Sequence, residues 1–231
     1  MGERDRAEMP IAICLVSGGL DSAVCLAEAV ASYQVAVLHI NYGQRTEARE
    51  LAAFHALADH FGLEKRLVVD ISYLKEIGGT SLIDDSLEVE TGLPSDDQKV
   101  PSTYVPFRNA NILSVGASWA EVLGATALFI GAVEEDGSGY PDCREVFYQQ
   151  FERAIDAGTK PETNIQIKTP LIQLNKAAIV KRGEDLNVPW HLTWSCYTES
   201  DEACGVCESC RLRLRGFADA GQTDPIRYRP S

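Results

Sequence analysis

The sequence predicts an α/β fold with a doubly wound, mostly parallel β-sheet and a C-terminal four-cysteine segment. Short apolar runs alternate with stretches of helical periodicity, which is typical of a parallel sheet covered by helices. The 231 residues allow one large domain with a small appendage, but hardly two full domains. We expect residues 1–188 to form the α/β domain and residues 189–231 to form a segment packed on it.

Apolar runs mark the candidate strands. The run at 11–16 is apolar at every position, as expected for a strand that is buried on both faces. Three similar runs and a weaker fifth one follow along the chain. They lie at residues 35–40, 67–69, 127–132 and 165–168.

Apolar residues at helical spacing predict crossover helices between these runs. The predicted helices cover about residues 22–32, 51–61, 112–123 and 147–154. Asn175 fits the N-cap of a further helix, because Leu174 and Ile179 can form a hydrophobic staple around it. We expect Gly183 and Pro189 to bring that helix to a close.

Charge and composition limit the class of partner. A net charge of -13 argues against a broad nucleic-acid-binding surface, although one small anion can still bind in a pocket. No apolar run is long enough to span a membrane, and the first ten residues carry no apolar signal region, so we expect a cytoplasmic protein. The stretch 77–106 is rich in glycine, proline and acidic residues, which predicts a long functional or mobile loop.

A glycine-rich turn follows the first predicted strand, where residues 17–22 read SGGLDS. Gly18 and Gly19 allow positive φ and close approach of a ligand, and the N-terminus of the next helix points its N–H groups at the same place. Ser17 and Ser22 add hydroxyl donors, while Asp21 can cap the helix or help to hold Mg²⁺. The spacing differs from the Walker and dinucleotide motifs. The turn predicts an anion-binding loop, with a plain capped turn as the alternative.

Four cysteines lie within fifteen residues near the C-terminus, at Cys196, Cys204, Cys207 and Cys210. Four thiolates at this spacing can surround one tetrahedral zinc ion, and a site filled by protein ligands is structural because no position is left for water. Two disulfides, or a redox C-x-x-C pair, are the alternatives. The arginines at 211, 213 and 215 form a basic run, for which we expect a solvated or intersubunit face rather than a nucleic-acid contact.

The SGGLDS turn after an apolar strand resembles the signature of the PP-loop ATP pyrophosphatase superfamily. With the cysteine cluster, the chain is similar to the 7-cyano-7-deazaguanine synthase family of that superfamily, and the resemblance covers nearly the whole chain. The further matching segments, in order, are NYGQR (41–45), VPFRN (105–109), GYPDCR (139–144), TPL (169–171), SCY (195–197) and CESCR (207–211).

The resemblance implies an adenine nucleotide alpha hydrolase-like fold and an ATP-dependent carbon–nitrogen ligase of queuosine biosynthesis. The family converts 7-carboxy-7-deazaguanine and ammonia to 7-cyano-7-deazaguanine through an adenylated acid and an adenylated amide, releasing AMP. It implies ATP and Mg²⁺ at the reaction site and Zn²⁺ with a structural role. It further implies a cytoplasmic homodimer that acts on small molecules and binds neither nucleic acid nor membrane.

We also assign site residues, but no catalytic residue, because the motifs after the first, second and fourth strands should gather at the carboxyl edge of the sheet, where ligands of open α/β folds bind. The ATP site is assigned to Leu15, Val16, Ser17, Gly18, Gly19, Leu20, Asp21 and Ser22. The substrate site is assigned to Tyr42, Gln44, Arg108, Asn109, Tyr140 and Asp142. We expect the tyrosines to stack on a base, Arg108 to pair with a phosphate or carboxylate, and Asp142 to accept from guanine-like N–H groups. Ordinary packing, a surface ion pair and a turn role are the respective alternatives.

The chain departs from the family pattern at Asn41 and Thr46, where members commonly carry Asp and His. These changes put a proton-transfer role at the two positions in doubt. Three other functions stay open: a PP-loop ligase that joins the same acid to another acceptor, a tRNA-modifying relative, and a non-catalytic zinc module that only binds nucleotide. The last would bind ATP without releasing AMP.

Overall fold

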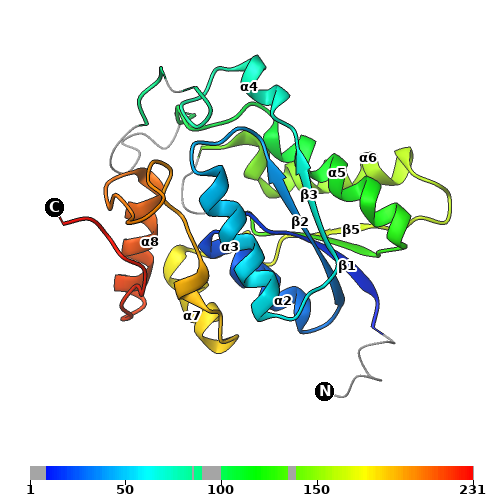
Figure 1. Cartoon of the computed structure of the whole chain (residues 1–231). Helices are drawn as coiled ribbons and strands as arrows, with labels where there is room; N and C mark the ends of the chain where they lie inside the picture. The colour runs from blue at the N-terminus through cyan, green and yellow to red at the C-terminus, as the bar shows by residue number, and fades with distance from the viewer. Residues whose placement is uncertain (1–8, 85, 90–99, 135–138, 231) are drawn as a thin grey trace.

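The computed structural model describes residues 9–84, 86–89, 100–134 and 139–230. Its centre is a five-stranded sheet in the order β3-β2-β1-β4-β5, in which every neighbouring pair is parallel (Figure 1). The strands are β1 (Ile11–Leu15), β2 (Gln34–Asn41), β3 (Arg66–Asp70), β4 (Ala127–Ile130) and β5 (Gln166–Lys168). All five predicted strands are confirmed, including the weakest, and the order reverses between β1 and β4 as in a doubly wound sheet.

Helices cover both faces of the sheet (Figure 1). They are α2 (Leu20–Val30), α3 (Glu47–His60), α4 (Tyr73–Ile77), α5 (Arg108–Leu123), α6 (Glu145–Gly158), α7 (Lys176–Asp185) and α8 (Glu208–Asp219), with short 3-10 turns η1 (Pro141–Cys143) and η2 (Trp190–Leu192). Side chains of α2, α3 and α7 pack on one face, and those of α5 and α6 pack on the other.

The alternation of side chains along β1 explains the two cores. Ala12 and Cys14 point to the first face, while Ile13 and Leu15 point to the second, and none of the four is more than 6% exposed. Successive residues of a strand point to opposite faces, so a strand covered on both sides needs apolar residues at every position. Cys14 therefore serves as a core residue.

Two predicted element boundaries are wrong, for local reasons. Helix α2 begins at Leu20 rather than at Ser22, because extended Gly19 is the N-cap and the helix starts within the glycine-rich turn. Gly183 lies inside α7 and does not end it. A Cβ at this position would lie 2.2 Å from the Trp190 ring, so the glycine is needed for close packing of η2 on α7.

The predicted long loop 77–106 is described only in part, and residues 85 and 90–99 of it lie outside the described residues. Arg45 holds the described portion. Its guanidinium donates to the backbone oxygens of Ser81, Asp84 and Leu87 at 2.9, 2.9 and 2.5 Å. The described part of this loop therefore lies against Arg45, which follows the end of β2.

Helix α8 packs on α7, and residues after α8 fold back on it. Arg213 is only 2% exposed and donates from Nε and Nη2 to Asp224 at 2.7 and 2.9 Å. Tyr228 donates to the same carboxylate at 2.6 Å. The expectation of a solvated face is therefore wrong for Arg213, because helix periodicity turns the middle of the run toward the interior.

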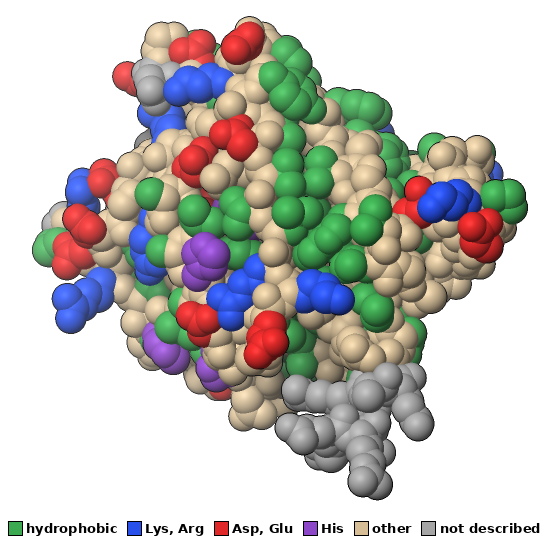
Figure 2. Space-filling view, turned by 45° about the vertical axis from the view of Figure 1, so that its right-hand side comes forward, with side chains coloured by type: hydrophobic (Ala, Val, Ile, Leu, Met, Phe, Trp, Pro, Cys, Tyr) green, Lys and Arg blue, Asp and Glu red, His purple; other side chains and the backbone are tan. Residues whose placement is uncertain are grey.

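One face of the molecule exposes apolar side chains. Figure 2 shows hydrophobic side chains gathered in a band down this face. The exposed large apolar residues include Tyr73, Phe107 and Val146, at 50, 58 and 56%. Contacts link Tyr73 and Phe107, because Tyr73 donates to Asn111, Asn111 donates to the Phe107 backbone oxygen, and the Phe107 ring packs against that of Phe147. None of the helices in the described residues has the length and apolarity needed to cross a bilayer.

Candidate functional site

A cleft of about 300 Å³ opens at the carboxyl ends of β1, β2 and β4. The order of the sheet reverses between β1 and β4, and in open α/β sheets ligands bind in the crevice that forms at such a point. The chain leaves β1 toward α2 on one face of the sheet, while α5 leads into β4 on the other face. The cleft therefore brings together segments that are far apart in the sequence.

The predicted anion-binding loop forms one wall of the cleft. Gly18 has φ +91, and a Cβ there would lie 2.8 Å from both the Glu50 backbone oxygen and the Ala53 Cβ, so only glycine fits without strain. Ser17 Oγ accepts from the Gly19 N–H at 3.3 Å and donates to Ser22 Oγ at 3.1 Å. These bonds hold the turn open at the N-terminus of α2, which favours an anion there.

Asp21 pairs with a residue that sequence reasoning missed. Its carboxylate oxygens lie 3.1 and 3.0 Å from Lys176 Nζ, and both side chains line the cleft. Lys176 is the first residue of α7, directly after the predicted N-cap Asn175, whose Oδ1 accepts from the Ala178 N–H at 2.9 Å. A lysine after a cap carries no functional signal in a sequence, so only the fold reveals this contact.

The other end of the cleft is aromatic and basic. Arg108 Nη1 donates to the Tyr42 hydroxyl at 3.1 Å, and the guanidinium lies 5.2 Å from the Tyr42 ring centre. Burial raises the pKa of Tyr42 and of Tyr140 to about 12, so both hydroxyls stay protonated at neutral pH. Burial acts to lower the pKa of Arg108, but the surrounding Tyr42, Tyr140, Cys143 and Asp142 outweigh it and raise the pKa.

Arg108 also carries a polar atom with no partner. Its buried Nε makes no hydrogen bond within the part of the chain that the structure describes. A buried donor without a partner costs free energy, so such a group in a cleft is suited to a ligand acceptor. Arg108 thus lines the cleft, and its pairing with a phosphate or carboxylate stays a prediction.

Three of the predicted residues lie behind the cleft wall rather than on it: among the described lining residues, Gly18, Gln44 and Asp142 are missing. Gln44 Oε1 accepts from the Tyr42 N–H at 2.8 Å. Asp142 is buried, and its Oδ2 accepts from the Asn109 N–H at the start of α5 at 2.9 Å. Both thus support residues that do line the cleft.

Two glutamates in the cleft were not predicted. Glu50 accepts from Thr46 Oγ1 at 2.8 Å and from Gln44 Nε2 at 3.3 Å, and burial raises its pKa. Glu208 is 7% exposed and accepts from Thr103 Oγ1 at 3.4 Å. Glu50 lies on an amphipathic helix and Glu208 between two cysteines, so neither stands out in the sequence from other acidic residues.

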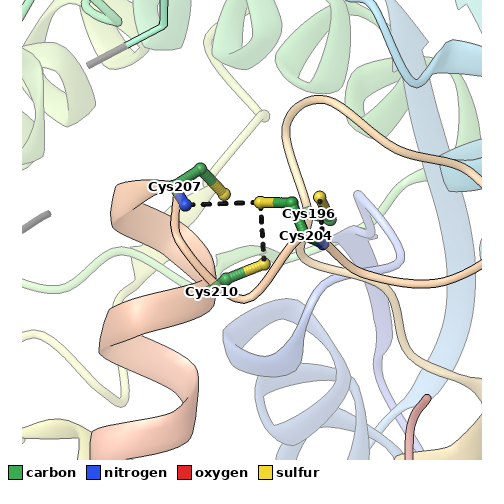
Figure 3. Close-up of side chains that lie close together, drawn as sticks. All are labelled: Cys196, Cys204, Cys207 and Cys210. Carbon is green, nitrogen blue, oxygen red and sulfur yellow. Dashed lines mark hydrogen bonds between the residues drawn. The ribbon is translucent and has the colours of Figure 1, made fainter. Parts of the chain in front are cut away.

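The four cysteines come together as predicted (Figure 3). Their Sγ atoms all lie within 4.8 Å of one another, with Cys204 and Cys210 3.9 Å apart, and all four are free of disulfides. Backbone N–H groups of residues 199 and 204 donate to Cys196 Sγ, and those of 206 and 207 donate to Cys204 Sγ, at 3.3–3.4 Å. The donors favour thiolate, so the cluster fits a tetrahedral metal site.

Comparison with known proteins gives consistent matches. A family model described as queuosine biosynthesis protein QueC matches residues 11–221. The 7-cyano-7-deazaguanine synthase of Chlorobaculum parvum is 53% identical over 220 residues, which cover 94% of this chain and 96% of that protein. The protein of the same name from Chlorobium phaeobacteroides is 54% identical over 220 residues, with the same coverage. That of Nautilia profundicola is 51% identical over 224 residues and covers 96% of this chain and 99% of that protein.

Proposed function

The chain belongs to the QueC family of queuosine biosynthesis proteins, and from this membership we propose how its cleft works. It is a ligase of the queuosine pathway, and the relatives named 7-cyano-7-deazaguanine synthase share more than half of its residues. The reaction joins 7-carboxy-7-deazaguanine to ammonia and forms a nitrile with ATP. A different acceptor, or a purely non-catalytic module, is not favoured by relatives that all carry this name.

The chemistry explains the need for ATP. A carboxylate does not react with ammonia at neutral pH because hydroxide is a poor leaving group. Transfer of AMP from ATP to the carboxylate releases pyrophosphate, and ammonia then displaces AMP to form the amide. A second ATP adenylates the amide oxygen, and loss of AMP together with the two amide protons leaves the nitrile. One site can run both steps, because each adenylates an oxygen on the same carbon.

We propose that the loop from Leu15 to Ser22 binds the triphosphate of ATP. The N–H groups at the start of α2 and the hydroxyl groups of Ser17 and Ser22 converge there, beside the ammonium group of Lys176. Donors that are held in place before the reaction stabilise negative charge that develops on the phosphorus and the leaving group. The same ammonium group pairs with the Asp21 carboxylate at 3.0 Å.

At the other end, Tyr42, Arg108, Asn109 and Tyr140 bind the carboxylate-bearing ring. The Nε of Arg108 supplies a charged donor for the substrate carboxylate, and the two protonated tyrosines supply aromatic surface. Gln44 and Asp142 do not line the cleft. They support it, because Gln44 accepts from the Tyr42 N–H and Asp142 accepts from the N–H of Asn109 in the first turn of α5.

Two metal ions complete the proposal. Cys196, Cys204, Cys207 and Cys210 would hold Zn²⁺, which crosslinks the segment and takes no part in the reaction because all four positions are filled by protein. Mg²⁺ would enter on the ATP phosphates and supply positive charge there, as it usually binds through phosphates and few carboxylates. Asp21, the nearby acid of the loop, is already paired with Lys176.

The single observation that supports the function most directly is the cleft itself. It joins the loop after β1 to a half-buried arginine whose buried Nε has no partner among the described residues, within one volume of about 300 Å³. A triphosphate and a carboxylate can thus be held next to each other, as adenylation requires.

The test is a mass-spectrometric time course with ATP, Mg²⁺, ammonium and 7-carboxy-7-deazaguanine. We expect the acid to disappear through the amide to the nitrile, with two AMP and two pyrophosphate formed per nitrile. Formation of ADP, or AMP release that does not depend on the acid, would contradict the proposal. ATP binding without turnover would support the non-catalytic module instead.

The assembly and location of the protein are also proposals. The exposed side chains of Tyr73 and Phe107 and the band of hydrophobic side chains in Figure 2 support a homodimer, since contiguous apolar patches often mark protein–protein contacts. The net charge of -13 supports action on small molecules without nucleic acid. The cysteines of the cluster are close together but form no disulfide, which supports a reducing cytoplasm. Sedimentation of the full chain at several concentrations would test the dimer.

A further inference from the structure

The segment that leads into the cysteine cluster crosses the phosphate loop. The Trp194 N–H donates to the Gly18 backbone oxygen at 2.8 Å. A Cβ on Gly19 would lie 3.5 Å from the Trp194 oxygen and 4.0 Å from Ser195 Oγ. Ser195 lines the same cleft as Ser17 and Gly19. Its hydroxyl is therefore a neighbour of the glycine-rich turn, although Ser195 lies 173 residues after Ser22, the end of that turn.

A buried arginine fixes the Ser195 hydroxyl from behind. Arg213 Nη1 donates to Ser195 Oγ at 3.3 Å and to Thr193 Oγ1 at 2.8 Å, while the Asp224 carboxylate holds the other side of the guanidinium. Arg213 and Asp224 have side chains that are 2 and 3% exposed. The guanidinium fork is rigid and donates only, so it sets both the place and the orientation of the serine hydroxyl.

The direction of this bond decides what the hydroxyl can do. Ser195 Oγ accepts from Arg213, so its own hydrogen remains to be donated to another acceptor. A hydroxyl that accepts from a charged donor becomes a better donor itself. Because Asp224 already neutralises Arg213, the arginine contributes orientation at the loop and little net charge.

We propose that Ser195 is a phosphate-binding residue of the ATP site and that Arg213 is its positioning residue. This inference rests on the proposed binding of ATP at the loop between β1 and α2. It gives the C-terminal segment a direct part in nucleotide binding, because Ser195 precedes Cys196 in the chain and Arg213 lies one turn after Cys210 on α8.

The experiment measures binding of two ligands, Mg²⁺–ATP and adenosine, to the full-length protein by titration calorimetry. In Ser195→Ala we expect ATP affinity to fall about tenfold, the value of one hydrogen bond to a charged group, while adenosine affinity stays unchanged. Ser195→Thr keeps the hydroxyl and should restore most of the ATP affinity. The KM for 7-carboxy-7-deazaguanine should stay the same in both variants.

Thr193→Val provides the matched control. It removes the other hydroxyl that Arg213 Nη1 contacts, but Thr193 is fully buried, so we expect a lower melting temperature with unchanged ATP affinity. Arg213→Lys keeps the charge and loses the fork, so ATP affinity should fall while adenosine affinity does not. If that variant fails to fold, the comparison of Ser195→Ala with Ser195→Thr still tests the inference.

Two results would overturn the inference. The first is unchanged ATP affinity in Ser195→Ala, and the second is an equal loss of ATP and adenosine affinity, which would mean that Ser195 acts on the cleft as a whole. Neither result bears on the proposed reaction, because nitrile formation by the unaltered protein is measured separately.

Discussion

For Arg108, the sequence predicted the position in the site but not the contacts of the side chain. The sequence assigned it to the substrate site, and the structure places it in the cleft at the first position of α5. The contact with Tyr42 and the unpartnered Nε depend on two chain segments 66 residues apart. No local pattern encodes such a meeting.

Replacement of this arginine tests the substrate end of the cleft. In Arg108→Ala, loss of a charged hydrogen bond of about 1.5–3 kcal/mol should lower kcat/KM for 7-carboxy-7-deazaguanine by about 10- to 100-fold. Arg153→Ala removes an exposed arginine on α6 and should leave the kinetics unchanged. Unaltered kinetics in Arg108→Ala for both ATP and the acid would remove Arg108 from the site.

Glu50 makes stability depend on pH in a predictable direction. Burial raises its pKa above the usual 4.5, so the folded state binds a proton more readily than the unfolded state. The stabilisation by the protonated form is complete below 4.5 and is lost as pH rises through the folded pKa. The charged carboxylate then carries a desolvation cost at neutral pH.

The neutral variant Glu50→Gln lacks this titration. We expect the melting temperature of the variant, relative to the unaltered protein, to increase as pH rises from about 5 to about 8. The change with pH is the measured quantity, because the amide also alters the contacts with Thr46 and Gln44. A difference that stays constant over this range would contradict a raised pKa.

At the scale of elements, periodicity predicted which segments form strands and helices, but not where glycines pack. Gly183 satisfied the rule for a helix end in the sequence, whereas the structure continues α7 to Asp185. The reason is the approach of Trp190, whose ring occupies the space of a side chain at position 183. Glycine can either end a helix or allow a neighbouring side chain to pack closely, so the sequence alone does not distinguish the two roles.

Two glycine variants distinguish these roles. Gly183→Ala places a methyl group against the Trp190 ring and should lower the free energy of unfolding by about 1–3 kcal/mol. Gly158→Ala is the matched control at the end of α6, where nothing lies within 4 Å of the added Cβ. There alanine should be neutral or stabilise by up to about 1 kcal/mol. Chemical denaturation measures both, and equal effects would argue against the packing role.

At the scale of the whole molecule, the cysteine cluster is linked to the cleft. Trp194 and Ser195 precede Cys196 of the cluster: the Trp194 N–H donates to the Gly18 oxygen, and Ser195 lines the cleft. Glu208 lies between Cys207 and Cys210 and lines the same cleft. The division at residue 188 stays a prediction, and it would cut through the lining of one cleft.

Metal removal tests this link. Elemental analysis of the protein as purified should give one zinc per chain, and Cys204→Ser should lose it. Binding at such sites is worth about 10–16 kcal/mol, so we expect the segment 189–231 to lose hydrogen-exchange protection before the sheet does. ATP affinity should fall together with the zinc content. A metal-free variant with full protection and full affinity would show that the cluster does not need a metal.

The sequence by itself determined the parallel α/β architecture, the glycine-rich turn at the start of α2 and the four-cysteine cluster, because each depends on residues close together in the chain: buried strands, a glycine pair before a helix, and cysteines at short spacing. Only the tertiary structure decided the composition of the cleft beyond the matched motifs. Glu50, Lys176 and Ser195 line the cleft although they lie far from the glycine-rich turn in the sequence: Glu50 is 28 residues after Ser22, and Ser195 is 178 residues after Ser17. Such contacts depend on how the layers pack, and side-chain patterns along one segment carry no information about them.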